Sequence, residues 1–227
     1  QSLFDRSFNE NHLFVIGINK KVSNNGSTNF FNSLSVYDNE LNILDSYNKI
    51  NLVPFGEFLP LENILKVLGL RSLTNNYQSF SKGKKRELIE IEHGNFTLKI
   101  LPLICYEIIY SGRLFKSSSY DFIINISEDG WFGKSIGPKQ HFDHSIFRAI
   151  ENGKYILRSS NNGIAAIINP IGIVEQSVDF GESGYVDFVK MRKIQPTLFS
   201  RYGNKVFGFL TLLYILLIFS FNRIKNE

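Results

Sequence analysis

The sequence contains few residues of several types, and each shortage excludes a class of protein. Its 227 residues include one Cys, one Met, one Trp and four His. A single cysteine excludes an internal disulfide framework and any zinc site built from several thiolates. The net charge of +4 is small, and the Lys and Arg residues are scattered, so we expect no nucleic-acid partner. Gln1 opens the chain without a signal-peptide pattern, so we expect a start after processing or inside a longer protein.

Apolar residues are abundant and include one long run at the end of the chain. Hydrophobic residues make up 43% of the sequence, with 21 Phe and 10 Tyr, which is typical of a globular domain. Residues 206–221 (VFGFLTLLYILLIFSF) carry no charge and would form a helix of about 25 Å, near the short limit for a membrane span. We expect a transmembrane helix here, with a buried core helix as the alternative. Cations flank the run on both sides, so their count does not indicate its orientation.

Short apolar or alternating runs separated by turns precede this segment and indicate strands mixed with a few helices. The pattern predicts strands over residues 13–18, 33–37, 41–44, 96–105, 121–126, 155–158, 163–169 and 185–188. It predicts helices over residues 107–116 and 138–152, the second beginning at Pro138 and ending at Gly153. The Ser-, Asn- and Lys-rich stretch 71–86 is the best candidate for a mobile loop.

The sole thiol, Cys105, stands where an apolar strand ends and the first predicted helix begins. Backbone amides at a helix N-terminus favour an anion, so a cysteine placed there can act as a nucleophilic thiolate. Free cysteines are also among the most buried residues, and taken alone this context favours an inert structural thiol.

Two further segments contain chemistry-bearing residues. Residues 47–60 (YNKINLVPFGEFLP) place Lys49 and Glu57 in a stretch whose Pro and Gly content predicts a rigid irregular loop. A lysine near a thiol could stabilise both a thiolate and an oxyanion. Taken alone, however, the segment favours a solvated lysine and an ordinary turn carboxylate. Residues 127–138 surround the only Trp, Trp131, and by themselves are typical of a packed aromatic turn.

Other patterns argue against metal and cofactor chemistry. His141 and His144 are three residues apart, but no set of carboxylates accompanies them, so we expect no metal site. The sequence also lacks a Walker loop, a dinucleotide-binding glycine pattern and a Gly-x-Ser-x-Gly elbow. We therefore expect no cofactor.

Taken together and in this order, these segments resemble the nitrilase (carbon–nitrogen hydrolase) superfamily, and most closely its membrane-bound branch, the apolipoprotein N-acyltransferases. The resemblance rests on residues 47–60, 104–109 (ICYEII), 127–142 (SEDGWFGKSIGPKQHF) and 158–164 (RSSNNGI). It implies an α/β fold, a four-layer αββα sandwich, followed by one C-terminal transmembrane helix. We expect a catalytic domain over residues 1–195, a linker over 196–205, the span over 206–222 and a basic tail over 223–227.

The resemblance also implies a chemistry. By motif, Cys105 is the nucleophile and Lys49 the lysine of a Glu-Lys-Cys triad, and Glu57, Tyr106 and Glu107 match positions that support catalysis. The thiol would take an acyl chain from a phospholipid and pass it to the N-terminal diacylglyceryl-cysteine of a lipoprotein. The implied location is the bacterial inner membrane, with the catalytic domain on its periplasmic face and the C-terminus in the cytoplasm. We expect a monomer.

The sequence departs from the family pattern in several places. The family's base glutamate lies upstream of residues 13–18, and Glu10 stands in a different context, so we expect that glutamate before Gln1 and this chain to be a C-terminal fragment. Glu128, Gly130 and Lys139 stand where the family more often has Asn, Ala and an aromatic residue. Two alternatives remain open, namely a nitrilase-like amidase acting on a small amide and a non-catalytic, membrane-tethered binding domain.

Overall fold

Two β-sheets form the centre of the protein. The structure is a computed structural model that describes residues 7–24, 26–61, 79–93, 96–112, 114–115 and 119–225. The smaller sheet is antiparallel and contains β1 (Phe14–Asn24), β2 (Ser27–Tyr37) and β3 (Ile43–Asn48) in that order. The larger sheet has the order β4 (Ile89–His93), β5 (Phe96–Ile104), β6 (Phe122–Glu128), β7 (Ile156–Asn161), β8 (Ala165–Ile168) and β9 (Val174–Val178). Its strands β5, β6 and β7 run parallel, and the other neighbours pair antiparallel.

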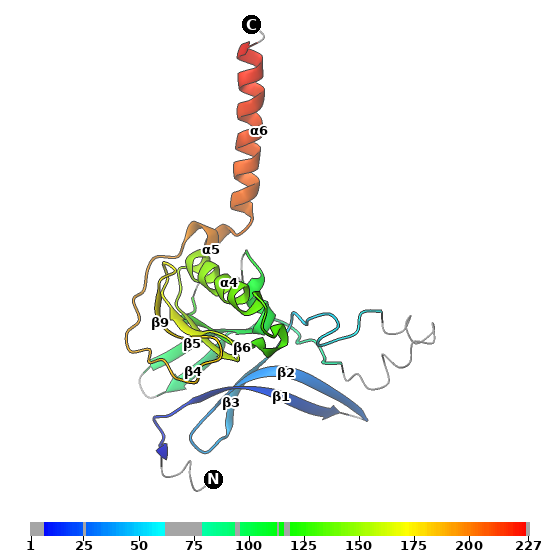
Figure 1. Cartoon of the computed structure of the whole chain (residues 1–227), viewed down its shortest axis with the longest axis vertical. Helices are drawn as coiled ribbons and strands as arrows, with labels where there is room; N and C mark the ends of the chain where they lie inside the picture. The colour runs from blue at the N-terminus through cyan, green and yellow to red at the C-terminus, as the bar shows by residue number, and fades with distance from the viewer. Residues whose placement is uncertain are drawn as a thin grey trace.

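The alternation of apolar residues along β5 explains how the layers stack. Ile100 and Ile104 point to one face and pack with Leu34 and Tyr47 of the smaller sheet, so the two sheets enclose a common core. Leu101 and Leu103 point to the other face, where α4 (Gly137–Asn152) packs through Phe142 and Ala149. Figure 1 shows the resulting order of layers, with the smaller sheet below, the larger sheet in the middle and α4 above it.

The C-terminal segment leaves this body. A short helix, α5 (Leu198–Tyr202), leads into α6 (Lys205–Lys225), which projects away from the sheets on the side of α4 (Figure 1). The most apolar 18-residue window of Lys205–Arg223, within α6, has a mean hydropathy of 1.8, and none of its residues is buried. By length and composition α6 can cross a membrane, and it contributes nothing to a soluble core.

The expected α/β fold is confirmed, and six of the eight predicted strands coincide with β1, β2, β5, β6, β7 and β8. The strand predicted over 41–44 begins later, at Ile43, because Leu41 adopts a left-handed turn conformation with φ 65°. The helix predicted over 138–152 is confirmed as α4, with Pro138 in its first turn and Gly153 as a left-handed cap.

Two predicted elements are wrong. The helix expected over 107–116 is only a 3-10 turn, η1 (Cys105–Ile109), and Tyr110 is already extended. A turn this short has little macrodipole, so the helix-terminus argument for Cys105 does not hold. Residues 185–188 form no strand, because the backbone of Asp187 bonds to the side chain of Gln176 and not to the backbone of a neighbouring strand.

The pattern also missed two strands of the larger sheet. In β4, Ile89 and Ile91 are buried and alternate with Glu90 and Glu92, but the segment is only five residues long. The sequence of β9 (VEQSV) is mostly polar, because it pairs on one side only and forms an edge of the sheet. The loop predicted over 71–86 lies partly outside the described residues, and its described part, 79–86, is irregular.

Candidate active site

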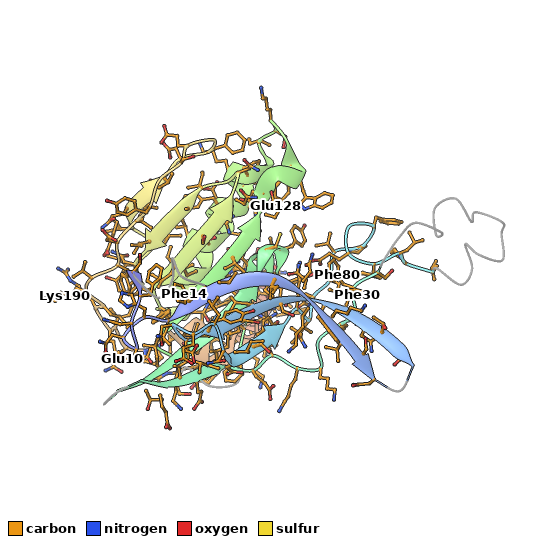
Figure 2. All side chains as sticks on the ribbon, turned by 90° about the horizontal axis from the view of Figure 1, so that it is seen from below. Glu10, Phe14, Phe30, Phe80, Glu128 and Lys190 are labelled. Atoms are coloured by element: carbon orange, nitrogen blue, oxygen red, sulfur yellow. The ribbon has the colours of Figure 1, made fainter. Side chains whose placement is uncertain are left out.

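The candidate site lies where the three parallel strands of the larger sheet end. Parallel strands bring their carboxyl ends to one edge, so Cys105 after β5 and Asp129 after β6 become neighbours of Asn161 at the end of β7. A cavity of about 880 Å³ opens at this edge, between the two sheets. Its walls are largely apolar and include Val15, Ile16, Ile18, Phe80, Ile126, Trp131 and Phe132. Figure 2 shows Phe80 beside Phe30 of β2, and Glu128 at the end of β6.

Lys49 and Glu57 form a buried ion pair in the cavity wall. Lys49 Nζ lies 2.8 Å from Glu57 Oε1 and 2.7 Å from Oε2, and the lysine side chain is 1% exposed. Asn32 Nδ2 and the Val53 amide also donate to this carboxylate, at 2.7 and 2.8 Å. The segment after β3 therefore forms the irregular loop that its Pro and Gly content predicts. Fixed in this way, the ammonium of Lys49 is a preorganised positive charge facing a cavity that also contains the thiol.

Glu107 is not among the residues that line the cavity, but it joins the loop to the turn that bears Cys105 (the nucleophile turn). Its Oε1 accepts hydrogen bonds from the Tyr47 hydroxyl, the Ile50 and Asn51 amides and Arg86, at 2.8 to 3.1 Å. Its Oε2 accepts from the Ile104 amide at 2.9 Å, and the side chain is fully buried. The carboxylate thus accepts five hydrogen bonds from the surrounding protein. The geometry indicates a residue that positions the turn around Cys105.

The backbone of Cys105 is held in a sparsely populated conformation. Its φ is +50°, which lies in the left-handed region, and it stands where β5 ends and η1 begins. A non-glycine residue here costs of order 1–3 kcal/mol and persists only where neighbours fix it. The side chain lines the cavity, and so does that of the next residue, Tyr106, which is 37% exposed.

Three buried polar residues hold this turn from the side of α4. His141 Nε2 lies 3.2 Å from the carbonyl oxygen of Cys105, and Nδ1 lies 2.8 Å from Asp129 Oδ1. Arg158 Nη2 donates to Asp129 Oδ2 at 2.7 Å, and Ser127 donates to Oδ1 at 2.6 Å. Arg158 also bonds to the side-chain oxygen of Asn125. The network forms a continuous chain from β7 to the nucleophile.

Asp129 is the charged centre of this network. Burial alone would raise the pKa of its carboxyl group, but the hydrogen bond from His141 and the positive charge of Arg158 outweigh burial and lower the pKa to about 2. The imidazole of His141 links this carboxylate to the turn that carries the thiol, because Nδ1 faces Asp129 and Nε2 faces the carbonyl oxygen of Cys105. Arg158 Nη2 also lies 3.3 Å from Nδ1.

The structure therefore brings Lys49, Glu57, Cys105 and Tyr106 together around one cavity, and Glu107 is not among the residues that line it. Sequence reasoning did not identify Asp129, His141 and Arg158 as site residues, although all three lie in the motifs that support the resemblance. The sequence suggests a metal ligand as the only role for His141, whereas in the structure both ring nitrogens face protein oxygens. Glu10 is exposed and does not line the cavity.

Comparison with known proteins shows the family to which this chain is related. The family model described as Carbon-nitrogen hydrolase matches residues 5–195. A Bradyrhizobium diazoefficiens protein named apolipoprotein N-acyltransferase is 38% identical over 191 residues, which are 84% of this chain and 35% of that protein. A Rickettsia prowazekii protein of the same name is 38% identical over 208 residues, 91% of this chain and 40% of that protein. The chain thus spans about two fifths of the length of these relatives, and the resemblance to this branch is confirmed.

Solved structures show the same fold at low sequence identity. Saccharomyces cerevisiae Nit3, a member of branch 10 of the nitrilase superfamily, has a TM-score of 0.52 and 16% identity, covering 74% of this chain and 57% of that one. A mutant amidase from Nesterenkonia sp. AN1, with a covalent addition at its active-site cysteine, has a TM-score of 0.50 and 14% identity, covering 79% and 61%. With a family match over most of its length and this fold, the chain belongs to the carbon–nitrogen hydrolase family.

Proposed function

We propose that this chain is the thiol-bearing part of a membrane-bound N-acyltransferase that completes the lipidation of bacterial lipoproteins. The observation that carries the proposal is the cavity itself, in which Cys105 and the Lys49–Glu57 pair face largely apolar walls. Apolar walls suit an acyl chain better than a small amide. The name of the relatives and the exposed apolar helix α6 support the same function.

The proposed reaction has two steps. The Cys105 thiolate attacks an ester carbonyl of a phospholipid, a C–S bond forms, the ester C–O bond breaks, and the lysophospholipid leaves as an alcohol after gaining a proton. The α-amino group of the lipoprotein's diacylglyceryl-cysteine then attacks the thioester, forming a C–N bond, losing a proton and releasing the thiol. Covalent catalysis divides one difficult acyl transfer into two easier ones.

Each site residue has a role in this proposal. Lys49 stabilises the negative charge that develops on the carbonyl oxygen in both steps, and removing such a donor typically costs about 10²–10³ in rate. Glu57 orients Lys49, and Glu107 fixes the turn that presents Cys105. Tyr106 lines the cavity together with Cys105, and we assign it to contact with the acyl group.

We further propose that α6 spans the inner membrane, with the catalytic domain on the periplasmic face and the C-terminus in the cytoplasm. A donor that resides in the membrane explains why the cavity is tethered there. We also propose that the protein acts as a monomer.

A labelled donor tests the function. The membrane-bound protein is incubated with a phospholipid that carries a labelled acyl chain, and the thioester is detected as label that hydroxylamine releases. We expect label on the wild type, none on Cys105→Ser, and transfer to a lipopeptide that begins with diacylglyceryl-cysteine. Label that persists in Cys105→Ser, or hydrolysis of small amides without thioester formation from phospholipid, would overturn the proposal and favour the amidase alternative.

A further inference from the structure

Glu128 is a carboxylate of the cavity wall that the proposed reaction does not use. It ends β6, lines the same cavity as Cys105 and is half-buried. Its Oε1 accepts a hydrogen bond from the Gly130 amide at 2.9 Å, and its Oε2 accepts from the side-chain amide of Asn161. Each carboxylate oxygen has two acceptor sites, so both oxygens can still accept a hydrogen bond from a ligand.

Among the residues that the structure describes, the charges around the cavity leave Glu128 without a cation. Of the ionisable residues that line it, Lys49 and Glu57 are paired with each other. Within the described part of the chain, no Lys, Arg or His forms an ion pair with Glu128. A carboxylate beside largely apolar walls attracts a cationic ligand more strongly than it would in open solvent.

The neighbouring glycine holds this carboxylate in place. A Cβ atom at position 130 would lie 2.5 Å from Glu128 Oε1, so any larger residue there would push the carboxylate away. The Gly130 amide also donates to the same oxygen, so the acid and its small neighbour form one local arrangement.

We propose that Glu128 is the binding subsite for a primary ammonium group. This inference rests on the proposed function, in which two molecules carry such a group. One is the acceptor, whose α-amino group is protonated until shortly before it attacks the thioester. The other is a donor phospholipid with an ethanolamine headgroup. In either case the ammonium donates to the free lone pairs of a carboxylate that the Gly130 and Asn161 N–H groups hold in place.

The experiment separates the two half-reactions in Glu128→Gln, which keeps the size of the side chain and removes its charge. Thioester formation is measured with phosphatidylethanolamine and with phosphatidylglycerol as donors, and transfer is then measured over a range of lipopeptide concentrations. If the acceptor binds here, the KM for lipopeptide rises about tenfold to a hundredfold, the cost of losing a charged hydrogen bond. If the headgroup binds here, the variant instead loses the preference for phosphatidylethanolamine over phosphatidylglycerol.

Two further variants complete the test. Glu182→Gln removes a carboxylate at an exposed position outside the cavity, and we expect it to behave as wild type in both half-reactions. Gly130→Ala keeps the charge of Glu128 but displaces it, and we expect a smaller change in the same direction. Unchanged lipopeptide KM and donor preference in Glu128→Gln overturn this inference. Absence of any thioester in the wild type overturns the proposed function instead.

Discussion

His141 Nε2 donates a hydrogen bond to the carbonyl oxygen of Cys105 across 3.2 Å, and so connects α4 to the turn that bears the thiol. That turn has an unfavourable φ of +50° at Cys105. Asp129 fixes the orientation of the imidazole, because its carboxylate lies 2.8 Å from the other ring nitrogen, Nδ1. The imidazole therefore acts through the backbone, and we expect it to position the thiol without contacting substrate.

Replacing His141 by Phe keeps a ring of similar size and removes both hydrogen bonds. We expect the rate of thioester formation on Cys105 to fall about tenfold to a hundredfold, because small displacements of a nucleophile are costly. The KM for the phospholipid should change little, since the apolar walls of the cavity remain. Stopped reactions with a labelled phospholipid, at several donor concentrations, measure both quantities.

His144→Phe is the matched control, one helical turn further along α4 and outside the cavity lining. It should keep the wild-type rate. A wild-type rate in His141→Phe would show that the turn around Cys105 holds its shape without the imidazole.

The pH dependence of the protein's stability should show the contribution of the Asp129 carboxylate. Its folded-state pKa of about 2 lies below the ordinary value of 3.8, so the group stabilises the fold fully above about pH 4. This contribution of about 2 kcal/mol is lost as the pH falls from about 4 to about 2. In Asp129→Asn we expect lower stability at pH 7 and a flatter decline across that interval. Thermal unfolding followed by circular dichroism in detergent, at half-unit pH steps, measures both changes.

Asp179→Asn makes the same chemical change at an exposed site and should leave the wild-type curve unaltered. If Asp129→Asn and wild type lost stability in parallel between pH 4 and pH 2, the carboxylate would not be the stabilising anion that its contacts with His141 and Arg158 imply.

The sequence was sufficient to predict those parts of the fold whose local pattern agrees with their environment. The apolar alternation of residues 96–105 predicted β5, and Pro138 with Gly153 predicted α4. It was not sufficient where a distant group decides the conformation. The helix expected after Cys105 is replaced by a short turn because the Glu107 side chain accepts from the amides of Ile50 and Asn51, more than 50 positions earlier in the chain.

The same limit applies to the candidate site. Each of Lys49, Glu57 and Cys105 stands in a motif that can be recognised in the sequence. Only the pairing of the strands shows that the three residues share a cavity. Asp129 directly follows β6, whereas His141 lies in α4 and Arg158 in β7, and nothing in their local sequence indicates that they meet. Their hydrogen bonds depend on the order of strands in the larger sheet.

Glu107 and Glu57 should respond differently to the same change. Glu107→Gln leaves Arg86 without a counter-charge and removes an acceptor from a buried cluster, so we expect about 3 kcal/mol of lost stability. Glu57→Gln releases Lys49 from its ion pair in the cavity wall. There we expect a smaller loss of stability and a fall in thioester formation of about tenfold or more. Chemical unfolding and label incorporation, measured on both variants, separate the two effects.

The Glu107→Gln and Glu57→Gln variants serve as controls for each other. Equal losses of stability with equal losses of rate would contradict the distinction between a residue that fixes the nucleophile turn and one that orients Lys49. Glu57→Asp adds a second check, because it keeps the charge but shortens the reach to Lys49 and should recover part of the lost rate.

The role of α6 as a membrane anchor can be tested without disturbing the catalytic domain. Leu212 and Leu216 are more than half exposed, and within the described part of the chain none of the apolar window of α6 is buried, so changing them removes no contact with the core there. A Lys in the middle of a span costs about 2.5–3.5 kcal/mol for insertion, so Leu212→Lys with Leu216→Lys should release the chain from membranes washed with alkaline carbonate. Leu212→Ile with Leu216→Ile keeps the helix apolar and should remain in the pellet. If the double Lys variant also stayed in the pellet, the chain would be held to the membrane by another segment, and the exposed apolar surface of α6 would need a protein partner to cover it.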